Sequence, residues 1–405
     1  MKLGLDLYNF SPEYPGGVST FSLGLAEGLV SSMGSNGSII IFSSATNDAY
    51  LRAFFSCRDV KIIRLHISPI ARYINRSIVY LSWFLKKYNL RYSFDNLFRR
   101  GQMTKIDEVI DALIIPTTTL NFYALYKPTI LCIHDIQQEY HPYYFSYHQR
   151  ILRWSSYRLS AARASCVQVS SKYIRECLLE KFTFIPETKF LLAPEGVDVK
   201  KFSQNGAAQR PVALPDIEKD LFIFYPAQIW KHKNHILLMH ALAEFKNQIG
   251  FELNCVLTGV DSGHWKNVES ICKKLGLDNV FYLGRVDFHE LLWLYEHTAA
   301  VLALGEHESS SLPIREGASF GKPLICSDIP PNIEASGALE LNMFDKNSYE
   351  SLADLLIRVI QNYEEFDARA KTNKETVANF SWDKIAQLYI SQAASLVNEN
   401  NNNYH

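Results

Sequence analysis

The amino-acid sequence predicts an α/β fold made of two doubly wound, Rossmann-like domains in series. Three observations support this prediction. The chain has 405 residues, which is too long for one ordinary hydrophobic core. Short apolar, β-branched runs alternate with helical patterns, as in parallel strands joined by helical crossovers. A stretch at Phe202–Asp220, which contains Ser-Gln-Asn-Gly-Ala-Ala-Gln-Arg-Pro and then Leu-Pro-Asp, interrupts the periodicity.

The apolar runs form two series, one on each side of this interruption. The predicted strands of the first series are Lys2–Tyr8, Ser38–Ser44, Lys61–His66, Asp111–Pro116, Thr129–His134 and Cys166–Ser170. Those of the second are Leu221–Ala227, Glu252–Thr258, Asn279–Leu283, Ala299–Leu304 and Pro323–Ser327. Amphipathic helices are predicted around Ile236–Lys246 and Phe288–His297, and a last helix at Trp382–Val397. The sequence thus predicts domains over 1–205 and 206–380, a helix over 381–397 and a polar tail over 398–405.

Composition excludes several classes of protein. The 41 basic and 42 acidic side chains nearly cancel, which argues against a nucleic-acid partner. The seven cysteines are scattered and contain no Cys-x-x-Cys pair, which favours a reducing compartment, with the cytoplasm as the expected location. We expect no signal peptide, because the first apolar run meets Asp6, and no membrane span, because no run of about eighteen apolar residues occurs.

The region 58–100 is basic and aromatic. It contains ten Lys or Arg residues and two Asp residues, interleaved with apolar side chains that include Trp83 and Phe84. Such a surface suits peripheral contact with an anionic membrane. A solvated helix face whose apolar side packs on its own domain explains the pattern equally well.

The stretch from Glu308 to Glu316 is the first candidate site. It follows the predicted strand Ala299–Leu304 and therefore lies at the carboxyl edge of the second sheet, where doubly wound folds bind ligands. Pro313 suits the first position of a helix, whose positive dipole end attracts phosphate. The two carboxylates can accept hydrogen bonds from sugar hydroxyls, although a dipole-complementing Glu316 and a solvated Glu308 would produce the same pattern.

A second candidate loop follows the first strand of the same domain. It carries Gln228 and Lys233, and Asn234 is a favoured helix cap. A Lys beside a helix start is well placed to hold a diphosphate. His232 and His235 lack a third ligand at a recognisable spacing, so we expect no metal site.

The first domain offers two weaker signals. Gly16 and Gly17 follow the first strand and allow the backbone to approach a phosphate or a sugar closely. They do not form the Gly-x-Gly-x-x-Gly fingerprint, which argues against a nicotinamide or flavin cofactor. His134 ends the strand Thr129–Ile133 and either reaches a ligand or is satisfied by neighbouring backbone.

Together these motifs resemble family 4 of the retaining glycosyltransferases, also described as glycosyl transferases group 1. The resemblance spans nearly the whole chain and includes Gly16-Gly17, Cys132-Ile133-His134-Asp135, Ala193–Asp198, Tyr225–His235, Tyr282–Val286 and the stretch from Glu308 to Pro330. The version at Tyr225–His235 is similar to a branch common among bacterial O-antigen and capsule enzymes. The resemblance implies the GT-B architecture, in which two Rossmann-like domains face a central cleft and a C-terminal helix crosses back to the first domain.

The resemblance also implies roles for the candidate residues. Lys233 would grip the donor diphosphate, Glu316 the ribose, Glu308 the transferred sugar and His134 the far hydroxyls of that sugar, with Glu308 and His134 as the catalytic groups. The remaining donor-binding positions would be Gly16, Gly17, Gln228, Ser310, Ser311 and Leu312. Two departures stand out, because Gln228 replaces a customary Arg and Ser309–Ser311 replaces a customary Gly-Phe-Gly.

The expected activity is therefore transfer of a sugar, mannose from GDP-mannose first, from a nucleotide sugar to a lipid-linked or oligosaccharide acceptor in surface polysaccharide synthesis. The first domain would bind the acceptor and the second the donor. No metal or cofactor is expected, since the helix dipole and Lys233 would stabilise the leaving diphosphate. The expected location is the cytoplasm or the cytoplasmic face of the inner membrane. A nucleotide-sugar epimerase of the same shape, a phosphorylase, and an inactive scaffold that binds nucleotide sugars or glycans are the alternatives.

Overall fold

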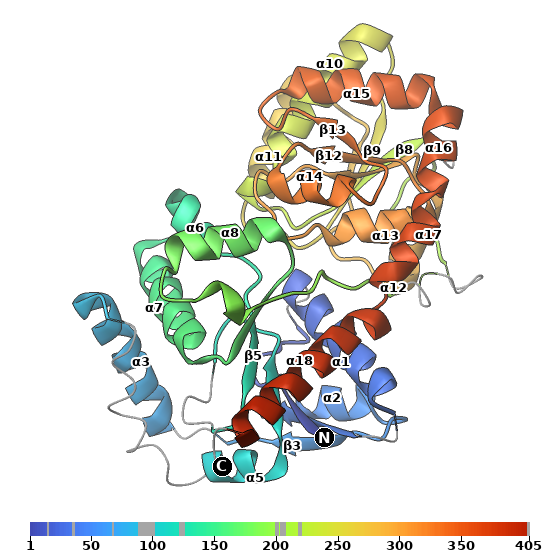
Figure 1. Cartoon of the computed structure of the whole chain (residues 1–405). Helices are drawn as coiled ribbons and strands as arrows, with labels where there is room; N and C mark the ends of the chain where they lie inside the picture. The colour runs from blue at the N-terminus through green and yellow to red at the C-terminus, as the bar shows by residue number, and fades with distance from the viewer. Residues whose placement is uncertain are drawn as a thin grey trace. The chain divides into compact units, whose positions relative to one another are not determined.

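The structure, a computed structural model, describes residues 1–13, 16–34, 37–66, 69–87, 102–120, 126–198, 202, 208–217 and 221–402 (Figure 1). The chain forms two compact units. The first consists of Met1–Gly196 together with Trp382–His405, and the second of Val197–Ser381.

The first unit contains a seven-stranded sheet in the order β3-β2-β1-β4-β5-β6-β7, with every pair parallel. Its strands are β1 (Lys2–Asp6), β2 (Ser38–Ser43), β3 (Lys61–Arg64), β4 (Ala112–Ile115), β5 (Thr129–Cys132), β6 (Cys166–Val169) and β7 (Phe190–Leu192). Successive side chains face opposite sides of the sheet, so Ile39 and Ile41 enter one core and Ile40 and Phe42 the other.

Helices cover both faces of this sheet. The helices of the unit are α1 (Gly17–Met33), α2 (Asp48–Phe54), α3 (Pro69–Leu85), α5 (Gln102–Val109), α6 (Gln137–Tyr140), α7 (Tyr147–Arg163), α8 (Lys172–Lys181) and α18 (Trp382–Asn402), with 3-10 turns η3 (Pro142–Tyr144) and η4 (Glu187–Lys189). Buried side chains of α1, α2 and α18 share one core with the sheet, and those of α5, α7 and α8 share the other.

The second unit repeats this plan with six parallel strands in the order β10-β9-β8-β11-β12-β13. Its strands are β8 (Phe222–Pro226), β9 (Asn254–Thr258), β10 (Val280–Tyr282), β11 (Ala300–Ala303), β12 (Leu324–Ser327) and β13 (Asn342–Phe344). Its helices are α10 (His235–Ile249), α11 (Trp265–Leu275), α12 (Phe288–His297), α13 (Leu312–Phe320), α14 (Pro330–Ser336), α15 (Tyr349–Gln361), α16 (Tyr363–Lys371) and α17 (Asn373–Val377), with 3-10 turns η5 (Lys231–Lys233) and η6 (Ala378–Phe380).

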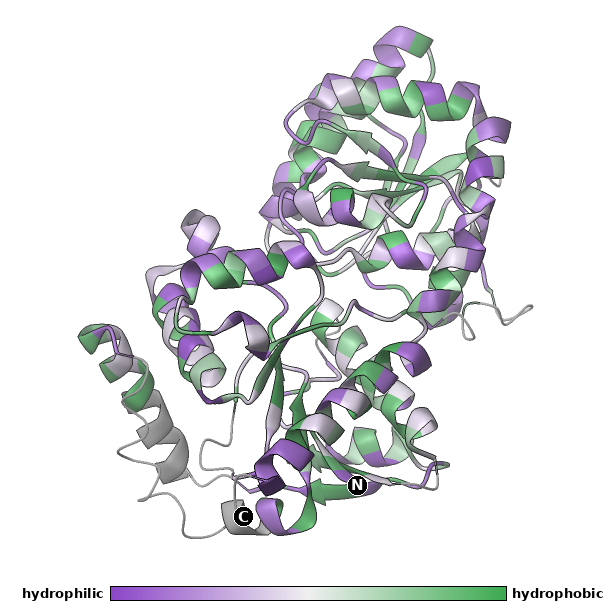
Figure 2. Ribbon diagram, viewed as in Figure 1, coloured by the Kyte–Doolittle hydropathy of each residue, from purple (hydrophilic) through white to green (hydrophobic). Residues whose placement is uncertain are grey.

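The two faces of this second sheet are covered by different helices. One core contains buried residues of α10, α11 and α15, and the other those of α12, α13 and α17. The apolar strands of both units accordingly lie inside layers of helices whose outer residues are polar (Figure 2). The predicted pair of doubly wound α/β domains is confirmed.

Helix α18 returns the chain to the first unit, where it lies along α1 and completes a core. Trp382 begins this helix and packs in a pocket of glycines. A Cβ at Gly24 or Gly196 would overlap the Trp382 ring, and one at Gly28 would overlap its carbonyl oxygen. Three glycines from two separate segments thus make room for one tryptophan, which fixes the start of the crossover helix.

Several details differ from the sequence prediction. The units divide after Gly196, before the break at 205/206, because the Val197 N–H donates to the Phe380 carbonyl at 2.8 Å and the Val197 side chain is buried in the second unit's core. Helix α18 continues to Asn402, past the predicted end at 397, and residues 403–405 lie outside the described residues.

The sequence prediction also missed the short strands β7 and β13. Each has three residues and lies at the edge of its sheet. Neither contains a β-branched residue, whereas the edge strands β3 and β10, which the sequence predicted, contain Ile and Val.

The basic region 58–100 is described over residues 58–66 and 69–87, which include β3 and α3, while 67–68 and 88–100 lie outside the described residues. Within the described chain, none of the helices combines the length and the apolar character needed to cross a membrane.

Gly28→Ala is expected to lower the free energy of unfolding by about 1–3 kcal/mol, because backbone must shift to accept the new methyl group. Gly337→Ala is the matched control, since Gly337 is exposed, has a helical φ of -65° and meets nothing closer than 3.3 Å. Thermal or urea unfolding measures both. Equal stability of the two variants would contradict the proposed packing of Trp382.

Candidate active site

The candidate site of the second unit lies where the order of its strands reverses. Strands β8 and β11 are neighbours and parallel, so the loops that follow them leave the same edge of the sheet. The helix after β8 is α10, which covers one face, and the helix after β11 is α13, which covers the other. The two loops therefore diverge, which is the arrangement in which doubly wound sheets bind ligands.

Lys233 and Glu308 meet at this point. The Lys233 ammonium donates a hydrogen bond to Oε1 of Glu308, and the two side chains are 21% and 14% exposed. The backbones of the loops are joined as well, because the Glu306 N–H donates to the His232 carbonyl at 2.9 Å. Two sequence-predicted residues that lie 75 positions apart thus form one shielded ion pair.

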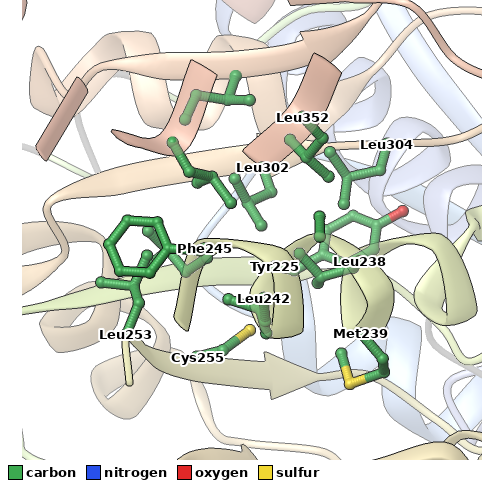
Figure 3. Close-up of a cluster of buried hydrophobic side chains, with 14 of the residues drawn as sticks. Tyr225, Leu238, Met239, Leu242, Phe245, Leu253, Cys255, Leu302, Leu304 and Leu352 are labelled. Carbon is green, nitrogen blue, oxygen red and sulfur yellow. The ribbon is translucent and has the colours of Figure 1, made fainter. Parts of the chain in front are cut away.

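Tyr225 holds the first loop against the core. Its ring is buried in the cluster of Figure 3, where the hydroxyl oxygen lies at the margin of the apolar side chains. That hydroxyl donates to the Lys233 carbonyl at 2.7 Å. Burial, with the Glu308 charge as the second cause, raises the pKa of Tyr225 well above its usual value of 10.0, so the phenol stays protonated and remains a donor.

Gly305 and Ser327 shape the second loop. A side chain at Gly305 would overlap the Glu308 carboxylate, so the absence of a Cβ lets that carboxylate lie over the loop. The Ser327 hydroxyl donates to the Gly305 carbonyl at 2.7 Å, and the Asn332 amide donates to the Ser327 carbonyl at 2.9 Å. The position of Glu308 consequently depends on the neighbouring strand β12 and on α14.

Glu316 has a different partner. It lies on α13, and its Oε2 accepts a hydrogen bond from the Tyr295 hydroxyl of α12. Tyr295 stacks on Phe320 with ring centroids 5.3 Å apart. Burial raises the pKa of Glu316 above its usual 4.5, although the bond from Tyr295 opposes this rise. Glu316 is therefore a fixed, partly desolvated hydrogen-bond acceptor in the middle of α13.

The serine loop ends at the start of α13. The helix begins at Leu312, with Ser311 as its cap residue, so Pro313 occupies the second helical position and not the predicted first. The Ser311 side chain makes no capping bond. Arg315, which the sequence analysis did not single out, donates to the Ser310 hydroxyl, and its guanidinium lies 5.2 Å from the Phe380 ring centre.

The two remaining predicted features of the first loop have local roles. The Gln228 side chain accepts a hydrogen bond from the Trp230 indole. Asn234 occupies the cap position of α10, but its backbone is left-handed and its side chain makes no capping bond. The expectation that Asn234 caps this helix through its side chain is therefore wrong, because left-handed φ and ψ aim the amide away from the helix N–H groups.

His235 follows in the first turn of α10. Burial, with the Lys233 charge second, lowers the pKa of His235 to about 3, so its imidazole is neutral at physiological pH. No group of three His, Cys, Asp or Glu side chains in the described ranges is arranged to hold a metal ion.

In the first unit, the carboxyl edge carries His134. Its Nε2 lies 2.8 Å from the Pro116 carbonyl, which can only accept, so Nε2 carries the proton. Nδ1 lies 4.0 Å from Oε1 of Glu195. The ring is buried against Phe21, with centroids 4.7 Å apart, and burial lowers the pKa of His134 below 6.5. The imidazole is thus neutral, with Nδ1 as its acceptor atom.

Gly16 and Gly17 lie at the amino end of α1 on this same edge. Gly16 is the cap residue, with an extended φ of -177°, and its carbonyl accepts from Thr20 at 3.0 Å. The helix begins at Gly17. Their neighbours Tyr14 and Pro15 lie outside the described residues.

The polar contacts that the sequence analysis missed all join distant segments. Tyr295 is 21 positions from Glu316, and Asn332 reaches Ser327 and through it the Gly305 loop. No local spacing signals such partners. Arg315 is the exception, because it lies only five residues after Ser310, in the helix that begins at Leu312.

Glu316→Gln is expected to raise stability at neutral pH. A carboxyl whose folded pKa is raised contributes stability that is fully present below its unfolded pKa and is lost as pH rises through the folded value. Glutamine keeps an acceptor for Tyr295 and does not ionise. Its advantage should therefore appear above the usual pKa of 4.5 and vanish below it.

Thermal unfolding between about pH 4 and about pH 8 measures this difference. Glu365→Gln, at an exposed position of α16, is the matched control and should not reproduce the effect. A variant with the same pH dependence as the parent protein would show that Glu316 is not desolvated.

Comparisons with known proteins show what the chain is similar to. Residues 210–377 match the family model described as Glycosyl transferases group 1. The chain is 23% identical over 274 residues to the O-antigen chain mannosyltransferase RfbU of Salmonella typhimurium, an alignment that covers 67% of this chain and 70% of that protein.

Two solved structures illustrate the similarity of fold. The first is Alr3699/HepE of Anabaena in complex with UDP and glucose, with a TM-score of 0.69, 16% identity and coverage of 98% of this chain and 100% of that chain. The second is sucrose-phosphate synthase from Thermosynechococcus elongatus, with a TM-score of 0.66, 18% identity and coverage of 98% and 100%. The GT-B fold expected from the sequence is confirmed.

Proposed function

We propose that the chain is a glycosyltransferase of group 1, the family whose model matches residues 210–377, and that it transfers a sugar with retention from a nucleotide donor to a growing glycan. GDP-mannose is the proposed donor, and the similarity to an O-antigen chain mannosyltransferase supports this choice. The observation that carries the proposal is the shielded pair of Lys233 and Glu308 at the point where the strand order reverses.

The donor would bind across the loops after β8 and β11. Lys233 would take the diphosphate, and Gln228 would lie beside it. The amino end of α13 would add the N–H groups of Ser311 and Leu312 and the hydroxyl of Ser310, because a helix start favours an anion. Glu316 suits the ribose hydroxyls, since its fixed carboxyl group is an acceptor, and Glu308 would accept from the transferred sugar.

In the proposed reaction, the acceptor hydroxyl attacks the anomeric carbon from the face that the diphosphate leaves. The bond from this carbon to the acceptor oxygen forms, the bond to the phosphate oxygen breaks, and the acceptor proton passes to that phosphate oxygen. Lys233 and the end of α13 stabilise the charge that develops on the diphosphate. The step needs no protein nucleophile, and we propose that it needs no metal.

The first unit would bind the acceptor. Gly16 and Gly17 would let the backbone approach the ligand, and His134 would use its Nδ1 as an acceptor for a sugar hydroxyl. The neutral form suits this role, because burial already disfavours the imidazolium. The proposed acceptor is a lipid-linked or oligosaccharide intermediate of a surface polysaccharide, at the cytoplasmic face of the inner membrane.

A thermal-shift comparison of GDP, UDP and dTDP should identify the nucleotide of the donor. The nucleotide that binds is expected to stabilise the fold by about 2.7 kcal/mol at one hundred times its dissociation constant. Lys233→Met should weaken its binding by about tenfold or more, since it removes a charge-assisted bond. Lys266→Met, at an exposed position of α11, is the control.

Turnover of GDP-mannose with a lipid-linked oligosaccharide acceptor completes this test. EDTA should leave turnover unchanged. Absence of a shift with every nucleotide would contradict the donor site, turnover without acceptor would favour an epimerase, and tight binding without any transfer would favour a scaffold.

An exposed aromatic surface supports contact with the membrane. At the end of α3, Phe84 is 81% exposed and Leu81 and Leu85 are also exposed. The exposed Tyr147 of α7 lies beside Trp83 of this helix, with ring centroids 6.4 Å apart. Trp83 packs on Trp154 of α7, with ring centroids 5.2 Å apart, and this contact holds the end of α3 on the unit. Figure 2 shows the apolar residues in this part of α3.

Basic groups flank this surface. Lys86 lies 3.1 Å from the centre of the Trp83 ring, and Lys87 follows it. Apolar side chains beside ammonium groups suit the interface of an anionic bilayer. We propose that this surface is where the enzyme meets the membrane that carries its acceptor.

Phe84→Ser is expected to weaken binding to vesicles of phosphatidylglycerol and phosphatidylcholine by about tenfold, the value of one buried aromatic side chain. Cosedimentation measures this binding. Val212→Ser, at a position 97% exposed in the second unit, should leave it unchanged. Equal binding of both variants, or no binding by the parent protein, would rule out this surface.

A further inference from the structure

Asn234 has an unusual backbone next to the proposed phosphate ligand. Its φ of 56° and ψ of 30° are left-handed. Among the residues with described coordinates, Lys86 is the only other non-glycine residue with positive φ. Residues with a Cβ disfavour this conformation, and asparagine tolerates it better than most. A conformation of this kind persists only where the surroundings require it.

The hydrogen bonds on either side of Asn234 show what requires it. Before it, the Lys233 N–H donates to the Trp230 carbonyl at 3.0 Å and closes the turn η5. After it, its own carbonyl accepts from Leu238 at 3.1 Å, in the first turn of α10. The left-handed residue therefore joins a tight turn to a helix of different direction, and Lys233 is the last residue before the change.

Lys233 is held from two further sides. Its carbonyl accepts from Tyr225, whose ring is fixed in the core, and its ammonium pairs with Glu308. The angles of Asn234 decide whether this anchored carbonyl and the packed helix α10 can both keep their positions. A right-handed or extended residue at 234 would break either the Tyr225 contact or the start of α10. Loss of the Tyr225 contact would release the Lys233 backbone and with it the ammonium that pairs with Glu308.

The Asn234 side chain offers no competing explanation. It is buried, it does not cap α10, and its Nδ2 finds no acceptor within hydrogen-bonding distance in the described part of the chain. Asparagine at this position therefore contributes its tolerance of the left-handed backbone, whereas its Nδ2 contributes no hydrogen bond.

We propose that Asn234 is a positioning residue whose left-handed backbone aims the Lys233 ammonium at Glu308, and so at the donor diphosphate. The second half of this statement rests on the proposed function, and the first half does not. Asn234 touches no reacting atom in this scheme and acts through Lys233 alone.

Two substitutions separate the backbone from the side chain. Asn234→Gly removes the amide but adopts left-handed angles freely. Asn234→Ala removes the amide and disfavours those angles. Positioning by the backbone predicts that glycine preserves the behaviour of the parent protein and that alanine does not. The unfolding temperature of each variant is measured alongside.

The first readout needs no nucleotide. Acylation of Lys233 by an N-hydroxysuccinimide acetate, followed by peptide mass spectrometry, reports how well Glu308 shields the ammonium, with the exposed Lys266 as internal reference. The relative rate at Lys233 should rise by about tenfold in Asn234→Ala, as the preference against left-handed angles implies. It should stay within about twofold of the parent rate in Asn234→Gly.

The second readout is calorimetric binding of GDP and of UDP. Asn234→Ala should bind the better nucleotide about tenfold more weakly than the parent protein, because fewer molecules have Lys233 in place. Asn234→Gly should restore the affinity. In a Lys233→Met background, Asn234→Ala should cause no further loss, since its effect passes through Lys233.

The outcomes that overturn the proposal are distinct. If Asn234→Gly disturbs Lys233, the amide matters and the backbone argument fails. This outcome can be read from the glycine variant alone, even if the alanine variant does not fold. If alanine behaves as the parent protein does, the left-handed angles are not needed. If neither nucleotide binds the parent protein, the proposed donor site fails, while the acylation rates still decide whether Asn234 positions Lys233.

Discussion

The pairing of β8 with β11 is the constraint on which the candidate site depends. These strands are separated by three α-helices and two strands in sequence, yet they are neighbours in the sheet. Their crossovers cover opposite faces, so the loops at their carboxyl ends diverge from one point. Lys233 leaves this point on one side and Glu308 on the other, and their ion pair closes the gap between the loops.

The partly buried ion pair of Lys233 and Glu308 requires further contacts, because two desolvated charges are costly unless their geometry and additional hydrogen bonds compensate. The support comes from beneath the loops. Tyr225 ties the Lys233 backbone to the core, and Ser327 ties Gly305 to the next strand. Gly305 leaves space for the Glu308 carboxylate. The charged groups are thus oriented by buried neutral groups whose own positions are set by packing.

Sequence pattern identified the interior of the fold well and its margins poorly. The eleven predicted strands are all present, because each lies between neighbours or carries a clear β-branched run. Helix α12 begins and ends where its pattern predicts, and Asp287 and Glu290 form a reciprocal cap at its start. Strands β7 and β13 and the division after Gly196 carried no such signal, since those strands contain no β-branched residue and the division depends on a contact with Phe380.

The sequence by itself determined the two doubly wound units, the candidate loops after their strands, and the residue types that suit a nucleotide sugar. Only the tertiary structure decided which of these residues meet. It paired Lys233 with Glu308, bonded Glu316 to Tyr295 and His134 to Pro116, and placed Trp382 among three glycines. The physical reason is the separation along the chain over which each kind of signal acts. Periodicity and capping act within a few residues, whereas these contacts follow from strand order and from the space that close packing leaves.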